Sequence, residues 1–119
     1  MTTRPSIDEL SAAVRAFAHE RDWAEFHDPK NLAMALASEA GELCSVLRWI
    51  RNEESDRALM SEPTRSAALS ELGDVAVLLL LLCERADARF DEVVLQKLAA
   101  NNVKYPVEHS KGKPEPPTM

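Results

Sequence analysis

An apolar stretch without a polar face most limits how this chain can fold. It runs from Val75 to Cys83, nine residues without a charge, and directly follows the acidic residues Glu71 and Asp74. A helix that is apolar on all sides needs neighbours on all sides, so the stretch predicts a core helix and places Asp74 on a helix buried all round. Nine residues are far fewer than the roughly twenty that span a bilayer, and we therefore expect no contact with a membrane.

Two pairs of carboxylates have the spacing of a single helix face. Glu39 and Glu42 are three residues apart, and so are Glu71 and Asp74. Because residues i and i+3 of a helix point from the same face, two such helices side by side would present four carboxylates to one point. Oxygen ligands of this kind suit Mg²⁺, which proteins usually hold through carboxylates and substrate phosphates.

Glu39 lies where a core side chain is expected. The apolar residues of its helix recur at steps of three or four and form a stripe through the Glu39 position, namely Leu32, Leu36, Leu43, Val46 and Ile50. An ionised carboxylate is unfavourable in such surroundings unless a cation, a metal or a raised pKa compensates. The pattern therefore favours a metal site, with a solvated acidic face as the alternative.

Length and charge narrow the class of protein. The 119 residues and 13.2 kDa correspond to one domain, with a net charge of −6. An acidic chain is not expected to bind polymeric nucleic acid through its phosphates, whereas a small phosphate ligand neutralised by a metal stays possible. Cys44 and Cys83 both lie within apolar helical patterns, which predicts packed, reduced thiols and a cytoplasmic protein. The start of the chain does not resemble a signal peptide.

Helix signals predict an all-α fold with four main helices. The expected helices run from the Ser6–Glu9 capping box to about residue 20, from Pro29 (capped by Asp28) to about Arg51, from Glu62–Thr64 to about Ala86, and from an Asp91 cap to about Val103. A polar linker is expected over residues 52–61 and a turn around Asp87. We assign residues 1–105 to the folded domain and residues 106–119 to a flexible tail, because the tail has little to bury.

Cationic and polar side chains share one face of the last expected helix. Lys97, Asn101, Lys104 and Tyr105 follow one another at i, i+4, i+7 and i+8. Such a face could hold phosphates together with a sugar or base edge. Lysines near a helix C-terminus also interact favourably with the helix dipole, so this structural role is the alternative.

Several further motifs complete a family pattern. They are Glu20-Arg21-Asp22-Trp23, Phe26-His27, Pro29-Lys30-Asn31-Leu32, Trp49 and Pro106. Together with the two acidic motifs and the last helix, they make the chain resemble the MazG-like all-α nucleoside triphosphate pyrophosphohydrolases, specifically the dCTP pyrophosphatase branch, over almost the whole of its folded part.

The resemblance implies a function and a role for each matching residue. It implies Mg²⁺-dependent hydrolysis of dCTP or a modified dCTP to the monophosphate and pyrophosphate, as in nucleotide pool sanitation, by a helical bundle completed as a homodimer or homotetramer with sites at the subunit contact. It assigns Mg²⁺ to Glu39, Glu42, Glu71 and Asp74, the base pocket to Trp23, His27 and Trp49, and phosphate, sugar or base contacts to Lys97, Asn101, Lys104 and Tyr105. We choose Glu39 as the catalytic base because its position in the stripe is the driest.

Two departures and three alternatives accompany this assignment. Leu78 stands where the branch usually has a tyrosine, and Val14 stands where a polar residue that carries a ring is expected, so base selectivity is the property most in question.

The same chemistry could act on another substrate, such as dUTP, phosphoribosyl-ATP or a damaged nucleotide. A di-iron bundle would need a histidine three residues after a glutamate, which this sequence lacks. A non-catalytic helical oligomerisation or regulatory module is the alternative from a different class.

Overall fold

The computed structural model describes residues 3–113, and these residues form helices and no strand. The helices are α1 (Ile7–Glu20), α2 (Pro29–Leu47), α3 (Ser55–Leu59), α4 (Thr64–Arg85), α5 (Phe90–Lys104) and α6 (Val107–Ser110), with single 3₁₀ turns η1 (Ala24–Phe26) and η2 (Asn52–Glu54). The predicted all-α class is confirmed, and the four long helices α1, α2, α4 and α5 are the four that the sequence predicts.

The helix starts are capped as the sequence predicts in two cases. The Ser6 hydroxyl accepts from the Glu9 backbone N–H at 3.1 Å, and the Glu9 carboxylate accepts from the Ser6 N–H at 3.2 Å. At the start of α2, Asp28 Oδ1 accepts from the Asn31 N–H at 2.9 Å. These bonds satisfy backbone donors that the first turn of a helix leaves unpaired.

Helix ends and linkers differ from the sequence prediction in three places. Helix α2 ends at Leu47, four residues early, because the chain tightens into a turn in which the Ile50 N–H bonds to the Leu47 carbonyl. The linker expected at residues 52–61 contains η2 and α3. Helix α5 starts from Arg89, not from an Asp91 cap; Asp91 is instead ion-paired to Arg89 at 3.0 Å, which lowers its pKa.

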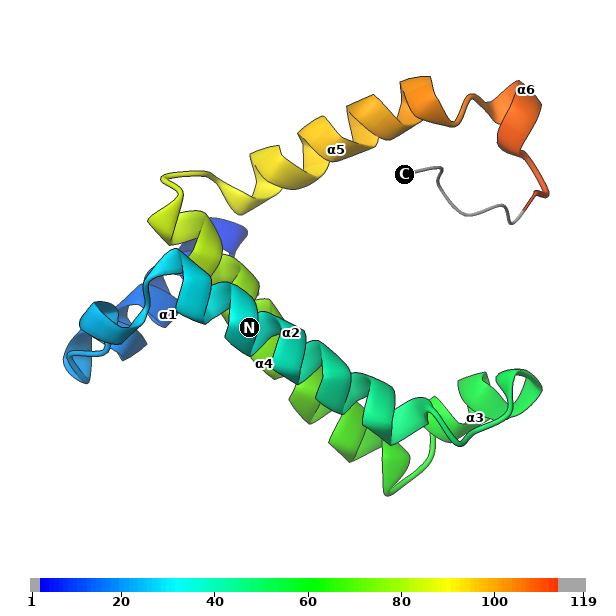
Figure 1. The fold of residues 1–119 in the computed structure, drawn as a ribbon, viewed down its shortest axis with the longest axis horizontal. Helices are drawn as coiled ribbons and strands as arrows, with labels where there is room; N and C mark the ends of the chain where they lie inside the picture. Colours follow the sequence, from blue (N-terminus) through cyan, green and yellow to red (C-terminus); the bar gives the residue numbers. More distant parts are fainter. Residues whose placement is uncertain (1–2, 114–119) are drawn as a thin grey trace.

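Helices α2 and α4 form the central pair of the fold. They run side by side in opposite directions, joined by α3 at one end, while α1 packs on α4 near the other end (Figure 1). The buried side chains of residues 3–113 lie within this group: Ala18 on α1, Leu32 on α2 and Ala68 on α4. The antiparallel pairing matters for function because it sets the middle of α2 opposite the middle of α4.

Helix α5 stands away from this group. It meets the rest of the chain at its N-terminal end, through α4 and through the ion pair of Arg89 with Asp8 at 3.2 Å, and then extends outward (Figure 1). Several of its apolar side chains are exposed: Val93, Val94, Leu95, Leu98 and Val103. Within residues 106–119, which we assign to a flexible tail, the structure has the short helix α6; that flexibility stays a prediction, and residues 114–119 lie outside the described residues.

Two burial predictions are wrong for the single chain. Helix α4 is not buried all round: Leu72, Asp74 and Val77 are exposed, and 6% of its most apolar window is buried. Cys44 is exposed, whereas Cys83 is half-buried; both are free thiols. By length and composition alone α4 is long and apolar enough to span a membrane, a test that the core helix of a soluble protein also passes.

Candidate active site

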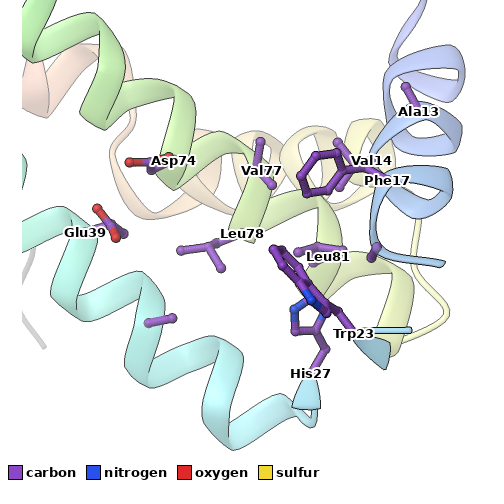
Figure 2. Close-up of a pocket in the computed structure, with 12 residues that line it drawn as sticks. Ala13, Val14, Phe17, Trp23, His27, Glu39, Asp74, Val77, Leu78 and Leu81 are labelled. Carbon is purple, nitrogen blue, oxygen red and sulfur yellow. The ribbon is translucent and has the colours of Figure 1, made fainter. Parts of the chain in front are cut away.

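Three of the four predicted metal ligands lie together where α2 faces α4. Glu39 on α2 and Glu71 and Asp74 on α4 each offer a carboxylate oxygen, and these three oxygens lie within 4.8 Å of one another. The carboxylates of Glu39 and Asp74 point toward each other across the gap between the two helices (Figure 2). Glu39 and Glu71 are half-buried and Asp74 is exposed. A cluster open on one side leaves room for a ligand.

The electrostatics of this cluster favour a bound cation. The pKa of Glu39 is raised above its ordinary value, first by a hydrogen bond with the Glu71 side chain, then by partial burial and by the negative charges of Asp74, Glu71 and Glu42. Glu71 Oε2 is buried and has no hydrogen-bond partner within the described residues. A divalent cation would relieve the repulsion and give this oxygen a partner. The residues present therefore fit the Mg²⁺ that the sequence predicts.

Glu42 lies outside the group of three carboxylates. Its side chain is exposed, although it is close enough for its charge to contribute to the raised pKa of Glu39. The helical spacing places Glu42 on the same side of α2 as Glu39, one turn further along. The structure thus brings three of the four predicted ligands to one point and leaves the fourth at the edge of the site.

A cavity of about 550 Å³ extends from Glu39 and Asp74 to an aromatic end formed by Trp23 and His27. Helices α1, α2 and α4 all contribute to its lining (Figure 2). Trp23 meets the ring of Phe17 edge to face at 5.7 Å between centroids, and the ring of His27 at 6.2 Å. A flat apolar surface beside a hydrogen-bonding ring suits a nucleobase.

A tight turn after α1 brings Trp23 into this cavity. Asp22 adopts a positive φ of 54°, and the Trp23 N–H donates back to the Ala18 carbonyl at 3.0 Å. Arg21 closes the turn, because its guanidinium lies 3.7 Å above the Phe17 ring and donates to the Phe17 carbonyl at 3.0 Å. The sequence predicts the roles of Trp23 and His27 but misses Phe17, whose helical spacing is that of an ordinary packing residue.

The other predicted substrate residues do not line this cavity in the single chain. Trp49 is 85% exposed. It follows the C-terminal end of α2, whereas His27 precedes the N-terminal end of that helix. The C-terminal half of α5 carries Lys97, Asn101 and Lys104, and Tyr105 follows it directly. This helix extends away from the α2–α4 pair, and none of the four residues lines the cavity (Figure 1). The Tyr105 hydroxyl is buried without a hydrogen-bond partner among the described residues. The single chain therefore holds the carboxylates and the aromatic end together, but not the cationic face of α5.

The raised pKa of Glu39 predicts how stability depends on pH. Between the ordinary value of 4.5 and the raised value, the metal-free folded chain binds more protons than the unfolded chain, so stability falls as the pH rises through that interval. We expect Glu39→Gln to remove this fall and Mg²⁺ to offset it. Thermal unfolding between about pH 5 and pH 8, with and without Mg²⁺, measures both effects. If stability depended on pH in the same way in wild type and Glu39→Gln, this explanation would be wrong. The control is Glu53→Gln, which removes an exposed carboxylate on η2.

The comparisons with known proteins agree with this geometry. No family model matches the chain. It is 35% identical over 111 residues to dCTP pyrophosphatase 1 of Bos taurus, covering 93% of this chain and 66% of that protein. It is also 35% identical over 102 residues to dCTP pyrophosphatase 1 of Homo sapiens, covering 86% and 60%. The chain thus spans slightly less than two thirds of the length of these curated relatives.

A solved structure matches over nearly its full length. It is a pyrophosphatase from Archaeoglobus fulgidus DSM 4304, 32% identical, with a TM-score of 0.79, and the match covers 89% of this chain and 97% of that one. Sequence and fold therefore agree over the region that contains the carboxylates and the aromatic pocket. The chain belongs to the family of MazG-like all-α pyrophosphatases.

Proposed function

We propose that this chain hydrolyses nucleoside triphosphates, dCTP among them, between the α and β phosphates, and releases the monophosphate and pyrophosphate. The observation that carries the proposal is the continuity of the site: the acidic cluster of Glu39, Glu71 and Asp74 opens into an aromatic-ended cavity large enough for a nucleoside. A binding module without catalysis would have no reason to oppose three carboxylates at the mouth of such a cavity. Removing such triphosphates from the nucleotide pool is the biological task that this reaction suits.

Each part of the site has a role in this reaction. Glu39, Glu71 and Asp74 would hold Mg²⁺, with Glu42 at the edge of the cluster. When bound, Mg²⁺ neutralises phosphate oxygens and stabilises the charge that develops on the leaving pyrophosphate. Glu39 is our choice for the catalytic base, because it is half-buried and lines the cavity at the point where the cavity meets the acidic cluster.

The base would bind at the aromatic end of the cavity. The face of Trp23 offers a stacking surface, and the His27 ring can donate or accept a hydrogen bond. Both side chains lie on the side of the cavity away from the carboxylates (Figure 2). This separation leaves the triphosphate beside the cluster and the base beside the aromatic rings.

A second copy of the chain would complete the site in a homodimer or homotetramer. Helix α4 exposes Leu69, Leu72 and Val77 in the single chain, and α5 exposes Leu95, Leu98 and Val103. Apolar surface of this extent favours association. The cationic face of α5 is complementary in charge to the acidic cluster. We therefore infer that α5 of one subunit supplies Lys97, Asn101, Lys104 and Tyr105, and the exposed α2 end supplies Trp49, to the site of another.

Mg²⁺ as the metal and the cytoplasm as the location are part of the proposal. The three clustered ligands are all carboxylate oxygens, the donor type that a hard cation such as Mg²⁺ prefers. Both cysteines are free thiols, which agrees with a reducing compartment.

Substrate profiling with product analysis tests the proposed function directly. The purified chain is incubated with Mg²⁺ and each common nucleoside triphosphate, and pyrophosphate is resolved from orthophosphate. We expect monophosphate and pyrophosphate from dCTP, and no turnover when a chelator removes the metal. Release of orthophosphate would move the cleavage to another bond. If no triphosphate were cleaved with Mg²⁺ or Mn²⁺, the catalytic function would be wrong and a regulatory module would explain the fold better.

A further inference from the structure

The aromatic rings at the end of the cavity are only partly buried. Phe17 is 47% exposed and Trp23 is 43% exposed in the single chain, so burial does not fix the orientation of either ring. The two rings meet edge to face, with 5.7 Å between their centroids (Figure 2). Such a pair contributes only modestly beyond the area that it buries. A further contact is therefore needed to hold the rings in one orientation.

Arg21, at the C-terminal end of α1, supplies this contact. Its guanidinium lies over the Phe17 ring, 3.7 Å from the centroid, well within the distance of about 6 Å at which a cation is attracted to a ring face. The same group donates to the Phe17 carbonyl at 3.0 Å. An ion pair with Glu20 at 3.7 Å joins two solvent-exposed side chains and adds little. Phe17 is thus the principal partner of Arg21.

Arg21 also begins the turn that delivers Trp23 to the cavity. The next residue, Asp22, has a φ of 54°, a backbone conformation that residues other than glycine seldom adopt. The turn therefore depends on the contacts around it, and the stacking of Arg21 on Phe17 is one of them. Arg21 is not among the residues that line the cavity. Any effect of Arg21 on a bound base must pass through Phe17 and Trp23.

We propose that Arg21 is a positioning residue for the base: it holds Phe17, and through Phe17 it orients the Trp23 ring before the nucleotide binds. The inference rests on the proposed function, which places the base against Trp23. Ordering the ring in advance lowers the entropic cost of binding. The guanidinium uses both its flat face and its N–H donors here, so lysine can replace it only in part.

Arg21→Met tests this role, because methionine keeps an extended apolar side chain and removes the charge and the donors. We expect the KM for dCTP to rise about three- to tenfold, the range that the loss of one cation–π contact predicts. The kcat should stay within about twofold, since the carboxylates are untouched. Arg21→Lys should recover part of the KM and serves if Arg21→Met does not fold. The matched control is Arg15→Met on the same helix, because Arg15 is ion-paired to Glu84 and lines a separate cavity.

A ligand without a base separates positioning from general damage to the fold. Tripolyphosphate carries the phosphate chain alone, so its inhibition constant should be the same in wild type and Arg21→Met. Phe17→Leu provides a second test, because it removes the ring on which Arg21 stacks. If Arg21 acts through Phe17, the double variant should have the KM of Phe17→Leu alone.

Fluorescence of Trp23 measures the orientation of the ring without turnover. The chain has two tryptophans, so Trp49→Phe leaves Trp23 as the single emitter. In that background and without nucleotide, Arg21→Met should lower the emission anisotropy and increase acrylamide quenching, whereas Arg15→Met should change neither. The affinity for dCMP, measured by calorimetry, should fall in Arg21→Met by the same factor by which the KM for dCTP rises.

The outcomes separate this inference from the proposed function. The inference is supported if Arg21→Met raises the KM for dCTP and loosens Trp23 while tripolyphosphate binds as before. It is overturned, with the function intact, if Arg21→Met behaves like Arg15→Met, or if tripolyphosphate binding weakens as much as dCTP binding. If wild type cleaved no triphosphate, the proposed function would be wrong. The Trp23 emission and the dCMP affinity would then still decide whether Arg21 positions the ring.

Discussion

Glu39→Gln is expected to lower turnover by about 10²- to 10⁴-fold, the range that a positioned general base contributes, while nucleotide affinity stays measurable. Glutamine keeps the size of the side chain and removes both its charge and its ability to take a proton. Glu39 faces Asp74 across the α2–α4 gap, whereas Glu42 of the same helix lies outside the cluster, so Glu42 is not positioned to substitute for it. Steady-state kinetics together with nucleotide binding by calorimetry measures the two effects separately.

Glu39→Gln could also lower turnover by weakening metal binding and not by removing the base. A loss that disappears at high Mg²⁺ concentration would indicate weakened metal binding, whereas a loss that persists at saturation supports the role of Glu39 as base. Glu42→Gln is the informative comparison, because Glu42 is exposed and lies outside the cluster of three. We expect a smaller effect for Glu42→Gln than for Glu39→Gln. Normal turnover of Glu39→Gln would make the assignment of the base wrong.

Mixing two inactive variants is expected to restore activity. If α5 of one subunit completes the site of another, Glu39→Gln and Lys97→Ala subunits are defective in different components of the site. In a two-fold dimer that contains one subunit of each, one site has both defects and the other has neither. If equal amounts reassort at random, half of the dimers are mixed and one of the two sites in each is intact, so about a quarter of all sites should be active. The measurement is the rate after unfolding and refolding the two variants together.

The refolding experiment has its own controls. Each variant refolded alone should stay inactive, and wild type refolded alone should recover, which shows that the procedure itself preserves the site. The matched control is Lys111→Ala, because Lys111 is a cation that follows α5 on the chain. When it is refolded together with Glu39→Gln, the activity should be only that of its own intact sites, with no gain from mixed dimers. If the mixed sample were as inactive as the separate variants, both residues would act within one subunit. The arrangement of α5 in Figure 1 would then have to change for catalysis.

Local chemistry explains which helices the sequence could predict. The capping box at Ser6 and the aspartate cap at Asp28 act within three residues of the chain, so their effect on a helix start is visible in the sequence. The start of α5 was not visible in this way. Asp91 has the residue type of a cap, but its carboxylate is ion-paired to Arg89, which also pairs with Asp8 on α1. A contact between distant segments decided the start of α5.

In the candidate site, too, the sequence predicted some features and the packing of helices decided others. The i and i+3 spacing of Glu71 and Asp74, and the place of Glu39 within an apolar stripe, depend only on helix periodicity, so the sequence alone determined that these carboxylates would be unusual. That Glu39 meets them while Glu42 does not depends on how α2 is rotated against α4. Trp49 and the cationic face of α5 have sequence signals as clear as that of Trp23, yet Trp49 is exposed and α5 extends away from the α2–α4 pair in the single chain.

The sequence by itself determined the all-α class, the long helices, the acidic motifs and the family to which the chain belongs, because each depends on residue types and spacings within a few turns of helix. Tertiary structure decided which carboxylates share a point and that Phe17 supports Trp23. It also left apolar side chains of α4 and α5 exposed in the single chain. Packing between helices is set by side chains far apart in sequence, and no local pattern encodes it.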